Sequence, residues 1–343
     1  MHELLNVLYV QTQGAVLHLD NDTVRIEMEG EPARRLPLLR LSAIVLFGRV
    51  TVTPFLIQRC AEDGRTVVWL DHRGRFKGRL EGQTRGNVLL RRAQHLALSD
   101  AGHTLRISRQ IVAAKIQNSR QVLLRAAREC AGYPDANPLR QTAEQMASIL
   151  ERLRQGRDLD AVRGDEGEAA RAYFGVFGYM VRSDREVFEP AGRTRRPPRD
   201  RMNALLSFLY TLLRHECVSA LEGVGLDPQV GYLHALRPGR PALALDLMEE
   251  LRPVVADRLA LTLVNRRQLK PEHFEEKPGG AVLLNEEGRR NLIVAYEQRK
   301  ATEIQHRVLD RRIPLGLVPH LQARLLARHL RGDLKEYPPF LYR

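Results

Sequence analysis

The stretch Glu81-Gly82-Gln83-Thr84-Arg85-Gly86 separates two parts of the chain that differ in fold. The pattern of apolar residues changes there. Before it, short runs rich in Val, Leu and Ile alternate with turn sequences such as Asp20-Asn21-Asp22, which is typical of β-strands. After it, apolar residues recur at intervals of three and four, which is typical of helices. The sequence therefore predicts a β domain over residues 1–82 and a helical domain over residues 83–343.

Strands and one helix are expected in the first domain. The helix spans residues 54–63, since Thr53 suits the N-cap, Pro54 the first helical position and Gly64 the position after the end. The strands are predicted at residues 5–10, 15–19, 23–28, 43–47, 66–70 and 76–80.

Helical periodicity continues through the second domain, so the predicted fold class is α+β multi-domain, with a small β domain followed by a larger all-α domain. A charged, proline-bearing loop over residues 183–201 interrupts this helical part. The helical periodicity is seen at residues 88–98, 107–127, 143–153, 169–180, 204–220, 243–263, 281–296 and 315–330.

Length and composition indicate a two-domain cytoplasmic protein. A chain of 343 residues exceeds a typical single domain. It has no apolar run of about 18 residues and no secretion signal at its start, so neither a membrane span nor export is expected. The three cysteines are far apart, as expected for buried thiols in a reducing compartment.

Charge is the strongest bulk property of the chain and predicts a polyanionic partner, nucleic acid above all. The net charge is +13, and only six of the 54 basic residues are lysines. Arginine presents a planar fork that matches phosphate oxygens. A GC-rich genome would explain the preference for arginine but not the excess of base over acid. Arg195, Arg196 and Arg199 lie in the most basic short segment, which is either a solvated loop or an arm that contacts phosphates.

Residues 225–253 carry the first candidate site. His234 ends a glycine-punctuated loop, and an apolar helix that follows carries Asp246, Glu249 and Glu250. Asp246 and Glu249 are three residues apart and share a helix face. Because a buried carboxylate must be paired, hydrogen-bonded or bound to a metal, this pattern predicts either a divalent-metal site or pairing with an arginine such as Arg252.

A third acidic residue comes from an earlier segment. Asp165 and Glu168 have the spacing of a capping box, with Asp165 as the N-cap, and Glu166 is left without such a role. Glu166 is then either a metal ligand or a favourable charge at a helix N-terminus. Two carboxylates and one imidazole suit Mn²⁺ or Mg²⁺, and with a basic surface they favour phosphodiester chemistry on nucleic acid.

Several motifs in this order resemble the Cas1 family, the integrases of CRISPR adaptation, and most closely its type I-C branch. The resemblance spans nearly the whole chain. It rests on motifs within residues 163–174, 197–207, 225–234, 245–253 and 263–267.

The resemblance implies a β-sandwich in the N-terminal domain and a catalytic, DNA-binding helical domain. It implies that Glu166, His234 and Glu249 bind the metal and that Asp246, on the same helix face, either binds it too or orients His234. Many members have aspartate at the position of Glu249. No other cofactor is expected.

The resemblance also implies an activity and partners. A 3′-hydroxyl of a short DNA duplex, the protospacer, attacks a phosphodiester of the CRISPR repeat without ATP. The protein forms a homodimer through its β domain and binds a small ferredoxin-like companion protein, with a CRISPR-associated exonuclease as a further partner. The alternatives are a non-catalytic DNA-binding assembly subunit and a metal-dependent hydrolase of other phosphodiesters.

Overall fold

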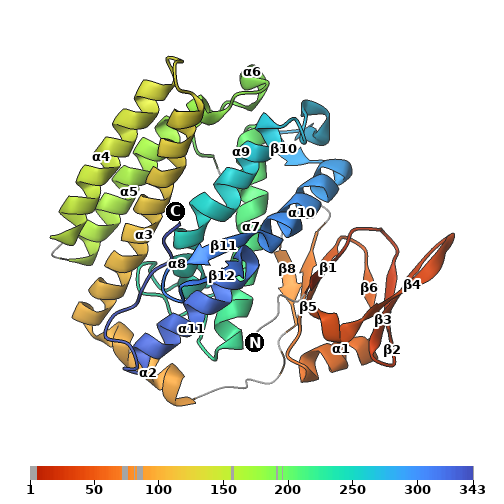
Figure 1. Cartoon of the computed structure of the whole chain (residues 1–343). Helices are drawn as coiled ribbons and strands as arrows, with labels where there is room; N and C mark the ends of the chain where they lie inside the picture. Colours follow the sequence, from red (N-terminus) through yellow and green to blue (C-terminus); the bar gives the residue numbers. More distant parts are fainter. Residues whose placement is uncertain are drawn as a thin grey trace. The chain divides into compact units, whose positions relative to one another are not determined.

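The chain folds into two compact units, Met1–Arg85 and Gly86–Arg343, the first rich in strands and the second in helices (Figure 1). The structure is a computed structural model that describes residues 6–71, 76–80, 82, 88–155, 158–190, 192–194 and 196–342. None of the helices in these ranges is both long enough and apolar enough to cross a membrane.

Two four-stranded sheets form the first unit. In one sheet β1, β5 and β7 run parallel and β8 is antiparallel to β7, with bounds Asn6–Val10, Leu41–Phe47, Thr66–Leu70 and Phe76–Arg79. The order in the other sheet is β4-β3-β2-β6, with bounds Glu31–Pro37, Thr23–Met28, Val16–Asp20 and Thr51–Val52. All six predicted strands are present, whereas β4 and β6 were not predicted.

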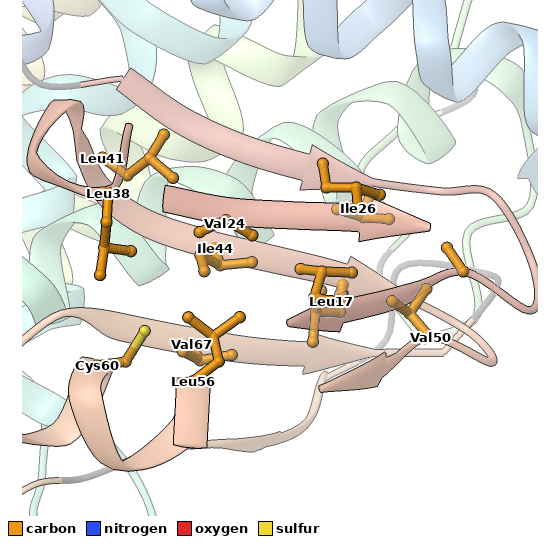
Figure 2. Close-up of a cluster of buried hydrophobic side chains, with 13 residues drawn as sticks. Leu17, Val24, Ile26, Leu38, Leu41, Ile44, Val50, Leu56, Cys60 and Val67 are labelled. Carbon is orange, nitrogen blue, oxygen red and sulfur yellow. The ribbon is translucent and has the colours of Figure 1, made fainter. Parts of the chain in front are cut away.

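The core of this unit lies between the two sheets (Figure 2). Leu17 and Val24 come from one sheet and Ile44 and Val67 from the other, and none of the four exposes any surface. Helix α1, Pro54–Glu62, begins after the N-cap Thr53, as predicted, and adds Leu56 and Cys60 to the same core. The expected β-sandwich is therefore present.

The second unit is built mainly of helices, and α3 packs against α4, α5 and α8 at its centre. The helices of this unit are α2 (Val88–Ser99), α3 (Ala101–Glu129), α4 (Ala136–Arg154), α5 (Leu159–Gly175), α6 (Arg185–Phe188), α7 (Arg201–Gly223), α8 (Ala242–Leu251), α9 (Arg258–Asn265), α10 (Glu286–Ala301) and α11 (Val318–Leu330).

Two short β-hairpins depart from the all-α expectation. The predicted helix over residues 281–296 is wrong at its start, because Asn285 caps α10 by accepting a hydrogen bond from the Gly288 N–H at 2.8 Å. The four residues before Asn285 form a strand instead of the start of the helix. The hairpins pair β9 (Phe274–Lys277) with β10 (Ala281–Leu284), and β11 (Glu303–His306) with β12 (Arg311–Pro314).

The predicted helix over residues 243–263 is present but not uniform. Between α8 and α9 a π-helical segment, Arg252–Asp257, contains Pro253. Proline has no N–H to donate to the preceding turn, so the regular hydrogen-bond pattern is interrupted there. The helix thus changes pitch three residues after the candidate ligand Glu249. Elsewhere, Cys60, Cys130 and Cys217 are buried and free, as expected.

Candidate active site

Helix α8 carries three buried carboxylates that face three different partners. Asp246 and Glu250 expose none of their surface and Glu249 exposes 2%. Buried carboxylates are costly unless they are paired or hydrogen-bonded, and each of these has its own set of partners. Asp246 contacts the loop that carries His234, Glu249 contacts basic side chains, and Glu250 contacts the C-terminal segment.

Asp246 fixes the position of His234. One carboxylate oxygen of Asp246 accepts hydrogen bonds from the backbone N–H groups of Tyr232 (2.6 Å) and Leu233 (3.0 Å). The other accepts from the His234 N–H (3.0 Å) and lies 2.7 Å from His234 Nδ1. With this oxygen as the acceptor, Nδ1 is the donor, and in a neutral imidazole Nε2 would then be the acceptor.

Close packing brings the histidine loop against α8. A Cβ atom at Gly231 would lie 2.6 Å from the backbone carbon of Ala242, which no other residue type could accommodate without a shift. Arg163, on α5, holds the loop from the other side by donating to the Leu233 carbonyl from Nε (2.9 Å) and Nη2 (2.8 Å). His234 is therefore held by two helices.

Glu249 lies between two cations. Lys115 Nζ, from α3, is 2.7 Å from its Oε2, and Arg252 Nη1 is 2.7 Å from its Oε1. Burial alone would raise the pKa of Glu249, but Arg252, Lys115 and His234 outweigh burial and lower this pKa to about 2. Glu249 is therefore a carboxylate at neutral pH.

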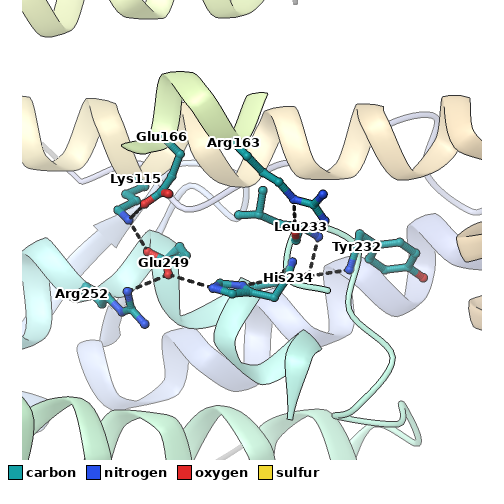
Figure 3. Close-up of polar contacts among 9 residues, drawn as sticks. Lys115, Arg163, Glu166, Tyr232, Leu233, His234, Glu249 and Arg252 are labelled. Atoms are coloured by element: carbon teal, nitrogen blue, oxygen red, sulfur yellow. Dashed lines mark hydrogen bonds and ion pairs between the residues drawn. The ribbon is translucent and has the colours of Figure 1, made fainter. Parts of the chain in front are cut away.

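Glu166 also pairs with Lys115 (Figure 3). The predicted helix start near Glu166 is wrong. Helix α5 begins after Asp158, whose side chain accepts from the Ala161 N–H at 2.8 Å, so Glu166 lies in the interior of the helix. Asp165 is not an N-cap but pairs with Arg152 at 2.7 Å, since a better cap stands seven residues earlier. The N-terminal charge interpretation of Glu166 is therefore excluded.

The structure brings Glu166, His234 and Glu249 together from two helices and a loop. His234 Nε2 lies 3.7 Å from Glu249 Oε1, and both glutamates contact the Lys115 ammonium group (Figure 3). Within the described residues, no three His, Cys, Asp or Glu side chains are already spaced as metal ligands. The Lys115 ammonium group pairs with both carboxylates. By chemical type, two carboxylates and an imidazole are donors that suit Mn²⁺ or Mg²⁺.

Glu250 lies outside this group. It accepts from Tyr337 Oη (2.7 Å), the Phe340 N–H (2.7 Å) and Gln322 Nε2 (3.2 Å). Burial raises the pKa of Glu250 to about 8, despite these hydrogen bonds. Its role is to anchor the C-terminal segment against α8.

Three basic residues of the site were not predicted as part of it. Lys115 and Arg163 were missed, and Arg252 was considered only as a rival partner. One feature of the sequence could have pointed to Lys115. Its charged side chain stands between two apolar residues that are buried, Ala114 and Ile116.

An aromatic side chain, Tyr210, and an acidic one, Asp257, support Arg252. Its guanidinium carbon lies 5.0 Å from the centre of the Tyr210 ring, as in a cation–π contact. Tyr210 Oη donates to Asp257 at 2.6 Å, and burial raises the pKa of Asp257 to about 6.

An open pocket of about 540 Å³ lies beside the loop that carries His234. His234, Arg163 and Leu236 are among the residues that line it.

The loop arginines have different environments. Arg195 lies outside the described residues. Arg196 is exposed, and Arg199 is exposed with its guanidinium donating to the Gly279 carbonyl. Arg193, in contrast, is partly buried and donates to Asn203 Oδ1 at 2.7 Å. A phosphate contact therefore stays a prediction for Arg195, Arg196 and Arg199.

The chain has a β-sandwich unit and a larger helical unit that carries the candidate site, and comparison with known proteins gives its family. The profile described as "CRISPR associated protein Cas1" matches residues 8–298, so the chain belongs to the Cas1 family of CRISPR adaptation nucleases and integrases. A relative from Moorella thermoacetica, named CRISPR-associated endonuclease Cas1 1, is 58% identical over 343 residues and covers 100% of both chains.

Two further relatives extend the comparison. The solved structure of a Cas1 protein from Thermotoga maritima has a TM-score of 0.81 and 25% identity, and covers 96% of this chain and 97% of its own. A CRISPR-associated exonuclease Cas4/endonuclease Cas1 fusion from Rhodospirillum rubrum is 37% identical over 337 residues, which are 97% of this chain and 57% of the fusion.

Proposed function

We propose that the chain is a metal-dependent DNA integrase and endonuclease that inserts short duplex DNA into a CRISPR array. The observation that carries this proposal is that Glu166 and Glu249 share one ammonium group, that of Lys115, while His234 Nε2 lies 3.7 Å from Glu249 Oε1. In the reaction, a 3′-hydroxyl of the incoming DNA attacks a repeat phosphodiester. A new phosphodiester forms, the old one breaks, and the leaving strand takes up the proton as a 3′-hydroxyl.

The side chains divide this work. Glu166, Glu249 and Nε2 of His234 would hold Mn²⁺ or Mg²⁺. When bound, such an ion stabilises charge on a scissile phosphate and helps to position a hydroxyl. Asp246 acts as a positioning residue, because all its hydrogen bonds go to the histidine loop. Arg163 holds the same loop from α5.

DNA and protein partners follow from charge and from family membership. The net charge of +13 suits two DNA duplexes, the protospacer and the repeat, held through their phosphates. A homodimer through the β-sandwich and a complex with the small ferredoxin-like companion are part of the proposal. The natural fusion of a relative to an exonuclease supports a CRISPR-associated exonuclease as a further partner.

Two adjacent glutamates provide the test. Strand transfer of a branched DNA is measured with Mn²⁺ and the companion protein for wild type, Glu249→Gln and Glu250→Gln. Both residues are buried on α8, but they face different elements. The proposal expects loss of at least about a hundredfold in Glu249→Gln and near wild-type transfer in Glu250→Gln, each checked for folding by circular dichroism.

Other outcomes would support the rival functions. DNA binding without strand transfer by the wild type would indicate a non-catalytic assembly subunit. Cleavage of RNA or nucleotides alone would indicate a hydrolase of other phosphodiesters. Equal loss in the two variants would contradict the site assignment, because the variants share a helix and differ in what they contact.

A further inference from the structure

Lys115 contacts both glutamates of the proposed metal site. Its ammonium group pairs with Glu166 on α5 and with Glu249 on α8, the latter at 2.7 Å (Figure 3). The Lys115 side chain is 13% exposed and that of Glu249 only 3%, so this contact is shielded from water. The three helices α3, α5 and α8 are thus joined by one cation that the chain itself supplies.

We propose that Lys115 is a built-in counter-ion that holds the two carboxylates together without metal and must leave them when a divalent ion binds. This inference rests on the proposed function, since it concerns the same site. An ammonium group and a metal ion cannot share the same carboxylate oxygens at contact distance, because like charges repel strongly in a poorly hydrated site. Binding is then an exchange of one cation for another.

The exchange has two consequences for the chain. It lowers the apparent affinity for the ion, because the lysine contacts must be broken first. It also frees a flexible cation beside the site, and the natural acceptor for an ammonium group is a phosphate oxygen. Arg252 pairs with the other oxygen of Glu249, Oε1, at 2.7 Å, and its guanidinium carbon also lies 5.0 Å from the centre of the Tyr210 ring.

The chain offers a matched control in Lys300. It also bridges two carboxylates, Glu216 Oε1 at 2.7 Å and Glu297 Oε1 at 2.9 Å, and its side chain is 5% exposed. Neither glutamate belongs to the proposed site. Removing Lys300 therefore reproduces the loss of a buried, doubly paired lysine without changing the proposed ligands.

The test measures Mn²⁺ binding by calorimetry and melting temperature in EDTA and in Mn²⁺, with no DNA present. The variants are Lys115→Met, Lys115→Arg, Lys300→Met and Glu249→Gln. We expect Lys115→Met to bind Mn²⁺ about tenfold more tightly than wild type, equivalent to about 1.4 kcal/mol, and to melt lower in EDTA. Lys115→Arg retains the charge and is expected to lack the gain, as is Lys300→Met.

Each result either supports or contradicts the counter-ion role of Lys115. Equal Mn²⁺ affinity in wild type and Lys115→Met, abolished by Glu249→Gln, would overturn the counter-ion role and leave the proposed metal site standing. No Mn²⁺ binding by any of these proteins would overturn both. Binding by Lys115→Met alone would support the inference. If the methionine variant does not fold, Lys115→Gln carries the same comparison.

Discussion

The Nδ1 atom of His234 lies 2.7 Å from Oδ1 of Asp246, and the same carboxylate also accepts three backbone N–H groups of the histidine loop. Four donors therefore saturate one buried side chain. This arrangement turns the imidazole so that Nε2 faces Glu249, 3.7 Å from its Oε1.

Replacing Asp246 separates its two roles. Asp246→Ala leaves three backbone donors buried without an acceptor, at roughly 1–3 kcal/mol each, so we expect a loss of several kcal/mol in the free energy of unfolding. Asp246→Asn keeps an acceptor but weakens the hold on Nδ1. It is expected to fold and to lose about 10–100-fold in strand transfer. Urea unfolding and strand-transfer rates measure the two effects, and full activity of the asparagine variant would contradict the positioning role.

Glu249 gives the folded state an acid-sensitive contribution to stability. Its pKa falls from 4.5 to about 2 on folding, so the stabilisation is fully present above pH 4.5 and is lost as the pH falls toward 2. At about 1.4 kcal/mol per pKa unit this is on the order of 3 kcal/mol. The stability difference between wild type and Glu249→Gln, measured in EDTA by denaturant unfolding, should shrink between pH 5 and pH 3. A difference that does not change with pH would contradict this assignment.

Glu250 should act in the opposite direction. Its pKa rises from 4.5 to about 8 on folding, so its contribution is present below pH 4.5 and is lost as the pH rises through 8. The size is on the order of 5 kcal/mol. Glu250→Gln cannot ionise, and its free energy of unfolding should decline less than that of wild type between pH 5 and pH 8. Parallel pH profiles of the two proteins would show that Glu250 keeps an ordinary pKa.

The loop arginines can be separated by salt dependence. If Arg196 and Arg199 contact phosphates, each change to alanine should weaken DNA binding and reduce the slope of log K against log salt by about 1. Arg193→Ala is the control, because Arg193 bonds to Asn203 and lies 5.3 Å from the Tyr210 ring centre. It should lower the melting temperature and leave the salt slope unchanged. Unchanged slopes in Arg196→Ala and Arg199→Ala would exclude them as phosphate contacts.

Local patterns predicted most of the fold. The strands with one apolar face were found because alternate residues enter the core, as in β3, where Val24 and Ile26 are buried. Strand β4 was missed since every one of its residues is exposed and no alternation marks it. The start of α5 was misplaced because Asp158 and Asp165 are both acceptable caps by type, and packing decides between them.

The sequence by itself predicted the two units and most helices, and it pointed to Glu166, His234 and Glu249 as candidate ligands. Tertiary structure alone decided which carboxylate meets which partner. Adjacent helical residues point about 100° apart, so Glu249 faces Lys115 on α3 while Glu250 faces the C-terminal segment. It also placed Lys115 between Glu166 and Glu249. No spacing along the chain encodes that contact, because it depends on how three helices pack together.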